Sequence, residues 1–288
     1  MIIVNLKGGL GNQMFQYALG RTLALKNKTI LKLDVAGLDR ANKIGDIYRA
    51  FGLSAFTIKK TIATAEEVQA LKYPYGKISK GWRWFAFKIL KRTHVVFEPA
   101  LLKRKGDIFL DGYFQSPRYF TDIRDTLLAD FTLEEPLSPA GATIANQIKS
   151  TTAVSIHVRR GDYIKNPQVL KEFGVCSLQY YQAAINHIKS IHPNPTFFVF
   201  SDDMNWVREN LPVGDNAVYV SDASIKDYQE LILMSTCSYN IIANSSFSWW
   251  GAWLNQNPNK IVITPNPWFE SAEWDKDLIS ESWIQLPK

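Results

Sequence analysis

The stretch AVSIHVRRGDY, residues 153–163, joins an apolar run directly to two arginines, a glycine and an aspartate. A short apolar run of this kind is typical of a buried strand, and the strands of a parallel sheet end at one common edge. Adjacent guanidinium groups repel each other unless an anion lies between them or in front of them. The stretch therefore predicts an α/β protein with an anion-binding site at one edge of its sheet.

The residues that follow this stretch alternate between apolar runs and segments with helical spacing. The predicted strands are 196–200, 217–220, 239–243 and 260–264. The predicted helices are 177–191, 204–210, 225–235 and 247–255. Because the strands are almost entirely apolar and alternate with helices, they predict a parallel sheet that is covered on both faces.

The N-terminal half begins in the same manner. The predicted elements are a strand at 2–6, a glycine loop, a helix at about 12–28, a strand at 29–33, and a strand with an aromatic loop at 107–116. Proline and small residues at 132–142 indicate a linker. Since 288 residues exceed the usual single domain of roughly 100–200 residues, we expect two domains, 1–140 and 141–288.

Charge is distributed unevenly along the chain. Residues 1–150 carry 23 basic and 13 acidic side chains, a net +10, and the remainder carries 10 and 14, a net −4. Nine of the basic residues lie within 77–105, with Glu98 as the one acid and with aromatic residues interleaved. This segment is either an interfacial helix that touches anionic lipid, or an amphipathic helix packed on its own domain with a solvated basic face.

The sequence contains no predicted export signal and no predicted membrane span. No run reaches the ~18 apolar residues that a span needs, and the first residues lack the basic and apolar regions of a signal peptide. Cys176 and Cys237 stand far apart without a Cys/His cluster, which favours buried thiols. We therefore expect a cytoplasmic protein with no nucleic-acid partner, and weak peripheral contact of residues 77–105 with the inner membrane face is an alternative.

Ligands of open α/β sheets bind beyond the carboxyl ends of the strands, so the residues after each strand are candidates. The first such loop is KGGLGNQ at 7–13, which opens a helix and brings backbone N–H groups close to a ligand. Asn12 and Gln13, next to Gly11, could donate to a sugar hydroxyl or an oxyanion. The loop matches neither the dinucleotide-binding nor the P-loop pattern, and a simple strand-to-helix turn is the alternative.

The second loop contains Arg159 and Arg160, behind His157 on the strand and before Asp162. Arginine is always charged and binds phosphate through two parallel hydrogen bonds, so this pair can do the electrostatic work of a divalent metal on a diphosphate. The alternative is a surface pair between Arg160 and Asp162, with Arg159 solvated.

The third loop contains two acids, Asp202 and Asp203, behind Ser201. Carboxylates of this kind could hold magnesium or manganese together with substrate phosphates. They could equally cap the following helix, because a Ser or Asp N-cap and an acid in the first turn suit the helix dipole. We favour the cap, with one carboxylate facing the site.

The fourth loop is Asn244, Ser245 and Ser246, at the start of a predicted helix. Hydroxyl groups and free backbone N–H groups at a helix start can hold an anion without a charged side chain. The helix then carries three tryptophans at helical spacing, of which we expect two in the core: Trp249, Trp250 and Trp253.

Taken together, these motifs resemble those of the α-1,2-fucosyltransferases and, more loosely, those of the α-1,6- and protein O-fucosyltransferases. The matching segments are GGLGNQMFQYA (8–18), DGYFQS (111–116), HVRRGDY (157–163), FSDD (200–203) and NSSFSWWGAWL (244–254). The resemblance implies a GT-B fold, an α/β architecture of two Rossmann-like domains that face a cleft. It also implies transfer of L-fucose from GDP-β-L-fucose, with inversion, to O2 of a terminal β-galactose on an oligosaccharide or a lipid-linked glycan.

The resemblance also implies roles for individual residues. Arg159, with Arg160, would grip the diphosphate without a metal or other cofactor, His157 would lie beside the nucleotide, and Asn12 near the reacting centre. The remaining donor-side contacts would come from this set: Gly11, Gln13, Asp202, Asp227, Asn244, Ser245 and Ser246. Asp227 would touch the guanine or the ribose.

The general base is not determined by these motifs. Asp162 is our first candidate for taking the proton of the galactose hydroxyl, and Asp202 and Asp203 are rivals. Two other functions stay open at this point. One is a glycosyltransferase for another nucleotide sugar with a metal at Asp202 and Asp203, and the other is a non-catalytic carbohydrate-binding protein that uses its 9 tryptophans.

Overall fold

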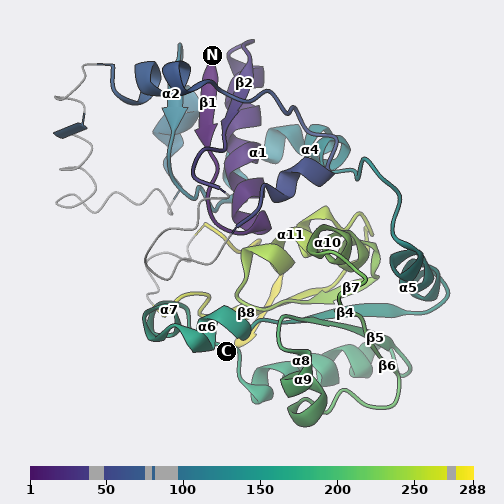
Figure 1. The fold of residues 1–288 in the computed structure, drawn as a ribbon. Coiled ribbons are helices and arrows are strands. Elements are labelled where there is room, and N and C mark those ends of the chain that lie inside the picture. Colours follow the sequence, from purple (N-terminus) through teal and green to yellow (C-terminus); the bar gives the residue numbers. More distant parts are fainter. Residues whose placement is uncertain (39–48, 75–79, 82–96, 271–276) are drawn as a thin grey trace. The chain divides into compact units, whose positions relative to one another are not determined.

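The computed structural model describes residues 1–38, 49–74, 80–81, 97–270 and 277–288. The chain divides into two compact units, Met1–Glu134 and Glu135–Lys288 (Figure 1). The boundary expected at 140/141 falls inside helix α5 (Pro139–Lys149), which packs against α10 (Asp227–Thr236) of the second unit. Because of this packing, α5 belongs to the second unit.

The first unit is built on a parallel three-stranded sheet in the order β2-β1-β3. Its strands are β1 (Ile2–Asn5), β2 (Leu31–Asp34) and β3 (Ile108–Leu110). Its helices are α1 (Leu10–Lys26), α2 (Ala65–Lys72) and α4 (Arg124–Asp130), with 3-10 turns at Gly52–Ala55, Pro99–Lys103, Pro117–Tyr119 and Thr121–Ile123. Most of α1 is buried, since it packs along the sheet and is in turn covered by the aromatic segment around Phe120.

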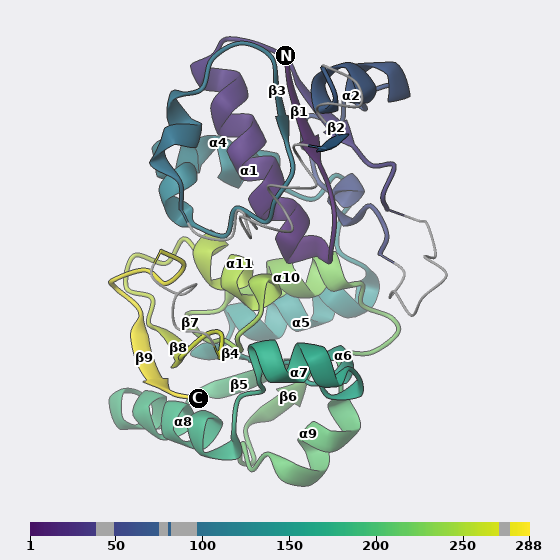
Figure 2. The same cartoon turned by 90° about the vertical axis from the view of Figure 1, so that its left-hand side faces the viewer.

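The second unit is built on a parallel six-stranded sheet in the order β6-β5-β4-β7-β8-β9. Its strands are β4 (Ala153–Val158), β5 (Thr196–Ser201), β6 (Ala217–Tyr219), β7 (Tyr239–Ile241), β8 (Val262–Asn266) and β9 (Ile284–Pro287). Besides α5 and α10, its helices are α6 (Gly161–Lys165), α7 (Pro167–Phe173), α8 (Leu178–Ile191), α9 (Met204–Asn210) and α11 (Ser246–Leu254). Helices α8 and α9 cover one face of this sheet, and α5, α10 and α11 cover the other (Figure 2).

The strand order locates the ligand site of the second unit. β4 is the first strand of this unit in sequence, and the chain then moves outward through β5 and β6 before it returns to the other side of β4 with β7. This is the order of a doubly wound nucleotide-binding sheet, in which ligands bind at the carboxyl edge where the winding direction changes. The loops after β4 and β7 flank that position, and they contain Arg159 and Asn244.

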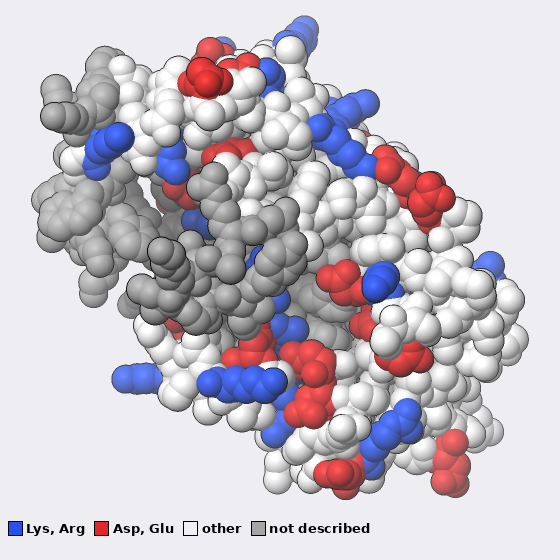
Figure 3. Space-filling view, viewed as in Figure 1, with Lys and Arg blue, Asp and Glu red and all other residues white. Residues whose placement is uncertain are grey.

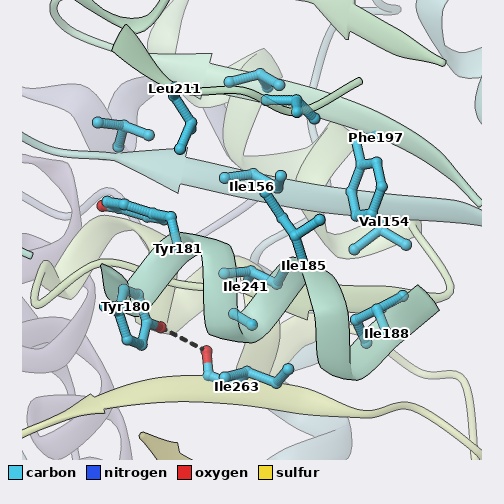
Figure 4. Packing of buried hydrophobic residues seen from close by; sticks show 14 of the residues in the cluster. Val154, Ile156, Tyr180, Tyr181, Ile185, Ile188, Phe197, Leu211, Ile241 and Ile263 are labelled. Atoms are coloured by element: carbon cyan, nitrogen blue, oxygen red, sulfur yellow. Dashed lines mark hydrogen bonds between the residues drawn. The ribbon is translucent and has the colours of Figure 1, made fainter. Parts of the chain in front are cut away.

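An aliphatic and aromatic core holds this sheet in place. Side chains of β4, β5 and α8 pack together below the sheet, among them Ile156, Phe197 and Ile185 (Figure 4). The Tyr180 hydroxyl donates to the carbonyl oxygens of Ile242, at 2.6 Å, and Ile263, at 3.1 Å. Helix α8 is therefore hydrogen-bonded, through Tyr180, to residues at the ends of strands that are far apart in sequence. These bonds restrict the motion of the carboxyl edge.

Most of the elements predicted from the sequence are confirmed in type, but three segments differ from the prediction. Residues 139–149 form α5 although 132–142 reads as a linker, residues 161–173 form two short helices, and residues 284–287 add strand β9. All three tryptophans of α11 are buried, rather than two of them. Both cysteines are buried free thiols, as expected.

The basic segment 77–105 lies largely outside the described residues, so its lipid-contact interpretation is not addressed by the structure. Among the described residues, no helix is long and apolar enough to cross a membrane. On the face shown in Figure 3, basic and acidic side chains of the described residues are interspersed and do not form a large patch of one sign.

Candidate functional site

The Arg159 guanidinium lies at the carboxyl edge of β4, between two carboxylates. Its Nη2 is 2.7 Å from Oδ1 of Asp162, and its Nη1 is 3.1 Å from Oδ2 of Asp202. The ring of Tyr163 lies against the guanidinium, with its centroid 5.5 Å from Cζ. Arg159 Nε is buried without a hydrogen-bond partner among the described residues. The guanidinium is thus held in one orientation by the two carboxylates and the ring.

Asp202 connects the ends of β4 and β5. Besides its contact with Arg159, its Oδ1 accepts the backbone N–H of Arg160 at 2.9 Å. A Cβ atom at Gly161 would lie 2.7 Å from Asp202 Oδ2, closer than such contacts occur, so a glycine is needed there for the carboxylate to approach. The glycine of the RRGDY segment therefore serves the charge network rather than a special backbone angle.

Arg160 has a different environment from Arg159. Its guanidinium lies over the indole of Trp206, with Cζ 3.5 Å from the ring centroid, and its Nε is 3.9 Å from Oδ2 of Asp203. Asp203 also caps α9 by accepting the backbone N–H of Trp206, which confirms the cap predicted for one of the two acids. The paired arginines are separated in this way, and each has its own carboxylate partner within the second unit.

His157 is buried on β4 directly below the arginines. Its ring packs against Phe247, at 5.5 Å between centroids, and its Nδ1 has no hydrogen-bond partner among the described residues. Burial lowers the pKa of His157 to about 3, and the positive charge of Arg159 adds to this, while Asp202 opposes it. The imidazole is therefore neutral near pH 7, with one nitrogen that can accept a hydrogen bond.

Asn244, after β7, is committed to the fold rather than exposed to a ligand. Its side-chain nitrogen donates to the carbonyl oxygens of Phe173, at 2.7 Å, and of Gly174 and Trp268, both at 3.3 Å. Its backbone carbonyl accepts the Tyr163 hydroxyl at 3.1 Å. These bonds connect Asn244 to the α6–α7 segment, and a contact of its side-chain nitrogen with the donor would require them to break.

Ser245 and Ser246 begin helix α11. The Ser245 hydroxyl is the N-cap and accepts the backbone N–H of Phe247 at 3.4 Å, while Ser246 is half-buried at the first helical position. The first N–H groups of a helix have no partner within it, and the helix dipole favours negative charge there. This helix start lies after β7, beside the switch point where Arg159 follows β4.

One acidic residue of the second unit was missed by the sequence-based reasoning. Asp227 is exposed at the start of α10, whereas Glu230, one turn further, is half-buried. Burial raises the pKa of Glu230 to about 7, against a hydrogen bond with Ser221, and the charges of Asp227, Asp222 and Asp202 raise it further. The sequence does contain a signal for Glu230, because this residue lies in the predicted helix 225–235 directly before a turn of apolar residues.

The glycine loop of the first unit contains two side-chain amides. Gln13 is hydrogen-bonded within the fold, and Asn12 can still contact a ligand. Gln13 is buried and donates to the carbonyl oxygens of Gly8 and Ala50, both at 2.9 Å, while its oxygen accepts the N–H of Gly52 at 3.1 Å. The contact of Gln13 with the sugar-nucleotide donor that the sequence predicts would require its side chain to break these three hydrogen bonds. Gly11 is buried within α1.

Asn12, in contrast, is half-buried at the edge of the first unit. Its Oδ1 accepts a hydrogen bond from Gln115 Nε2 at 2.7 Å. Gln115 belongs to the DGYFQS segment, which the sequence indicated as an aromatic loop and as one of the segments that resemble the fucosyltransferases, without a role for Gln115 itself.

The second unit can therefore bind an anion through a fixed arginine and a helix start. Among the described residues, no three His, Cys, Asp or Glu side chains are grouped so as to hold a metal ion. The Asp202 carboxylate contacts Arg159 and the Arg160 backbone, and Asp203 caps a helix, so this pair does not face one common point. This chemistry suits a phosphate or diphosphate group.

These features define a doubly wound α/β protein with a candidate anion site at its switch point. Residues 80–286 match the model of glycosyl transferase family 11, and the chain belongs to this family. It is 33% identical over 303 residues to the α-1,2-colitosyltransferase of Escherichia coli, with 100% of this chain and 99% of that protein covered.

A more distant relative and a solved structure extend the comparison. The galactoside α-(1,2)-fucosyltransferase 1 of Leontopithecus chrysomelas is 29% identical over 161 residues, which cover 52% of this chain and 44% of that protein. The crystal structure of NodZ α-1,6-fucosyltransferase soaked with GDP-fucose matches with a TM-score of 0.53 and 15% identity, over 88% of this chain and 91% of that chain. The fold is thus similar to that of a fucosyltransferase.

Proposed function

We propose that this chain is a galactoside α-1,2-fucosyltransferase. It moves L-fucose from GDP-β-L-fucose to O2 of a terminal β-galactose, with inversion and without a metal. The observation that carries the proposal is the Arg159 guanidinium, fixed at the switch point of the sheet by Asp162 and Asp202. The family membership and the resemblance of the motifs support the choice of fucose and of the α-1,2 linkage.

The proposed chemistry requires stabilisation of the leaving group. Fucosyl transfer passes through an oxocarbenium-like state, and negative charge develops on GDP as the bond to the sugar breaks. A preorganised donor aimed at such a developing charge is worth about 3–4 kcal/mol. Arg159 fits this role because its carboxylate partners and Tyr163 restrict its motion before the donor arrives.

We further propose that the two units face a cleft, as in the GT-B arrangement. In this arrangement the second unit binds GDP, with the phosphates at Arg159 and the start of α11, and the first unit binds the acceptor. The fold similarity to a fucosyltransferase supports this assignment. The natural acceptor beyond its terminal galactose is a separate question, which a panel of oligosaccharide and lipid-linked acceptors addresses.

A donor test separates this function from the alternatives. GDP should raise the melting temperature of the protein, and Arg159→Ala should abolish that shift and lower transfer to lactose by about a hundredfold or more. Arg208→Ala is a matched control, because Arg208 is exposed in the same unit and lies over Tyr219 instead of the site. No response of the wild-type protein to GDP would refute the proposal and would favour a carbohydrate-binding protein.

Metal independence is tested in the same assay. We expect activity to survive EDTA, because a cationic side chain rather than Mg²⁺ or Mn²⁺ neutralises the diphosphate in the proposed site. Loss of activity in EDTA, restored by Mn²⁺, would instead support the metal-dependent alternative at Asp202 and Asp203.

A second candidate donor is GDP-colitose, since the full-length relative carries the name of a colitosyltransferase. Colitose is fucose without its 3-hydroxyl group, so the two donors share the nucleotide and the diphosphate. Initial rates with GDP-fucose and GDP-colitose on one acceptor distinguish the two functions, and the higher kcat/KM identifies the donor.

A further inference from the structure

A polar cluster lies at the carboxyl edge of the sheet in the first unit. β1 and β3 are neighbours and parallel, so the residues that follow Asn5 and Leu110 meet at one edge. Asp111 Oδ1 accepts from Lys7 Nζ and from Asn5 Nδ2, both at 3.0 Å. The Lys7 ammonium also lies 5.0 Å from the ring centroid of Tyr113. The charges of Lys7 and Asp111 neutralise each other, and the Arg49 guanidinium also lies near this loop, with its Nη1 3.9 Å from the position of a Cβ atom at Gly9.

Two carboxamides lie at this edge and contact each other. Gln115 Nε2 donates to Asn12 Oδ1 at 2.7 Å, and both side chains are half-buried. Among the described residues, Gln115 Oε1 and Asn12 Nδ2 make no hydrogen bond. The pair therefore presents one acceptor and one donor side by side, and each amide fixes the orientation of the other.

The backbone immediately before Gln115 is strained. Phe114 has φ +53°, a left-handed conformation that is a clear outlier for an aromatic residue and costs roughly 1–3 kcal/mol. The ring is 1% exposed and packs edge-on against Tyr119, at 6.2 Å between centroids. The buried ring holds the turn in place and thereby sets the direction from which Gln115 reaches Asn12.

We propose that Gln115 and Asn12, at the edge where Lys7 lies over the Tyr113 ring, form a subsite for hydroxyl groups of the neutral sugar acceptor, with Phe114 as the residue that positions Gln115. This inference rests on the proposed function, because it assigns the acceptor of that reaction to named side chains. A paired donor and acceptor match adjacent sugar hydroxyls, and an aromatic ring with a polar tip suits the edge of a sugar.

The test is Gln115→Met, which keeps the length of the side chain and removes both hydrogen-bonding groups. We expect the KM for lactose to rise about tenfold or more, while the KM for GDP-fucose and the GDP-induced shift in melting temperature stay unchanged. Gln69→Met is the matched control, because Gln69 is exposed on α2 of the same unit. An unchanged KM for lactose would overturn the subsite.

A second variant separates the loss of the subsite from a disturbed fold. Gln115→Glu retains shape and an acceptor but removes the donor to Asn12, so the KM for lactose should again rise while the KM for GDP-fucose is kept. Equal losses for both substrates in both variants would indicate a disturbed fold and overturn the assignment. If the wild-type protein neither transfers fucose nor responds to GDP, the proposed function itself fails, which is distinguishable from wild-type transfer with an insensitive Gln115.

Discussion

Arg159 and Arg160 follow each other in sequence but have separate partners in the structure. Arg159 contacts Asp162 and Asp202, while Arg160 stacks on Trp206 near Asp203. The repulsion between adjacent guanidinium groups is therefore relieved by carboxylates of the chain itself, before any ligand binds. This changes the interpretation of Asp162, since a carboxylate 2.7 Å from an arginine is first of all a partner that orients it.

We predict that Asp162→Asn lowers kcat about tenfold or more, because Arg159 loses one of the two groups that fix it for the leaving group. If Asp162 only orients Arg159, the pH profile of kcat keeps its shape in the variant. Disappearance of the acidic limb of that profile would instead assign the general base to Asp162.

We predict that Glu230→Gln stabilises the protein more at pH 8 than at pH 5. Burial raises the pKa of Glu230 to about 7 from an ordinary value of 4.5, so the folded state retains a proton that the unfolded state releases. Folding stability from this group is therefore present below about pH 4.5 and is lost as pH rises through about 7. Glutamine is always neutral and avoids this loss.

Melting temperatures of the Glu230→Gln and wild-type proteins, measured from pH 5 to pH 8, check this prediction. A difference that does not change with pH would show that Glu230 has an ordinary pKa. Glu209→Gln is a control in the same unit, since Glu209 is exposed on α9.

At the level of secondary structure, the short helix α6 begins at Gly161, against the Asp202 carboxylate. We predict that Gly161→Ala raises the KM for GDP-fucose about tenfold, because a Cβ atom there would lie 2.7 Å from Asp202 Oδ2 and displace it from Arg159. Alanine is the better helix former, so a loss of donor binding would not result from helix propensity. Gly81→Ala is the control, since a Cβ atom at Gly81 meets no atom of the described residues within 4 Å. Equal KM values in the two variants would contradict the prediction.

The sequence predicted the central strands well, because apolar runs such as 153–158 are buried on both faces of a parallel sheet. It failed for β9, which alternates half-buried and exposed residues and ends in a proline at the sheet edge. It also failed for α5, whose Pro139 and small residues resemble a linker. The signal for that helix was the Ser138 N-cap before a proline at the first helical position.

The sequence predicts which loops form the site, because the strand order of the fold class brings these loops together. Arg159 and Asp202 follow neighbouring parallel strands, so their meeting follows from the fold class. The fixed roles of Gln13 and Asn244 were not predictable, because each binds backbone carbonyls of residues that are distant in sequence. An amide that binds a ligand and an amide that binds the fold look the same in a sequence.

At the level of the whole molecule, the proposed function assigns one substrate to each unit. We predict that GDP slows amide hydrogen exchange in the second unit at 158–163 and 243–247, and that lactose in the presence of GDP slows it in the first unit at 7–13 and 111–116. Mass spectrometry of peptic fragments measures both. Protection by GDP confined to the first unit would contradict the assignment.

The strand order of the second unit also determines when, during synthesis, the proposed nucleotide site can first form. β4 becomes central only when β7 pairs with it, and the residues between them form the β5–β6 side of the sheet and its helices. The two halves of the anion site, after β4 and after β7, are thus distant in the chain although adjacent in space. Such non-local pairing is slow. In the proposed function, a nascent chain on the ribosome lacks a complete phosphate site until α11 has emerged, so we expect GDP to aid the folding of the nearly finished polypeptide only.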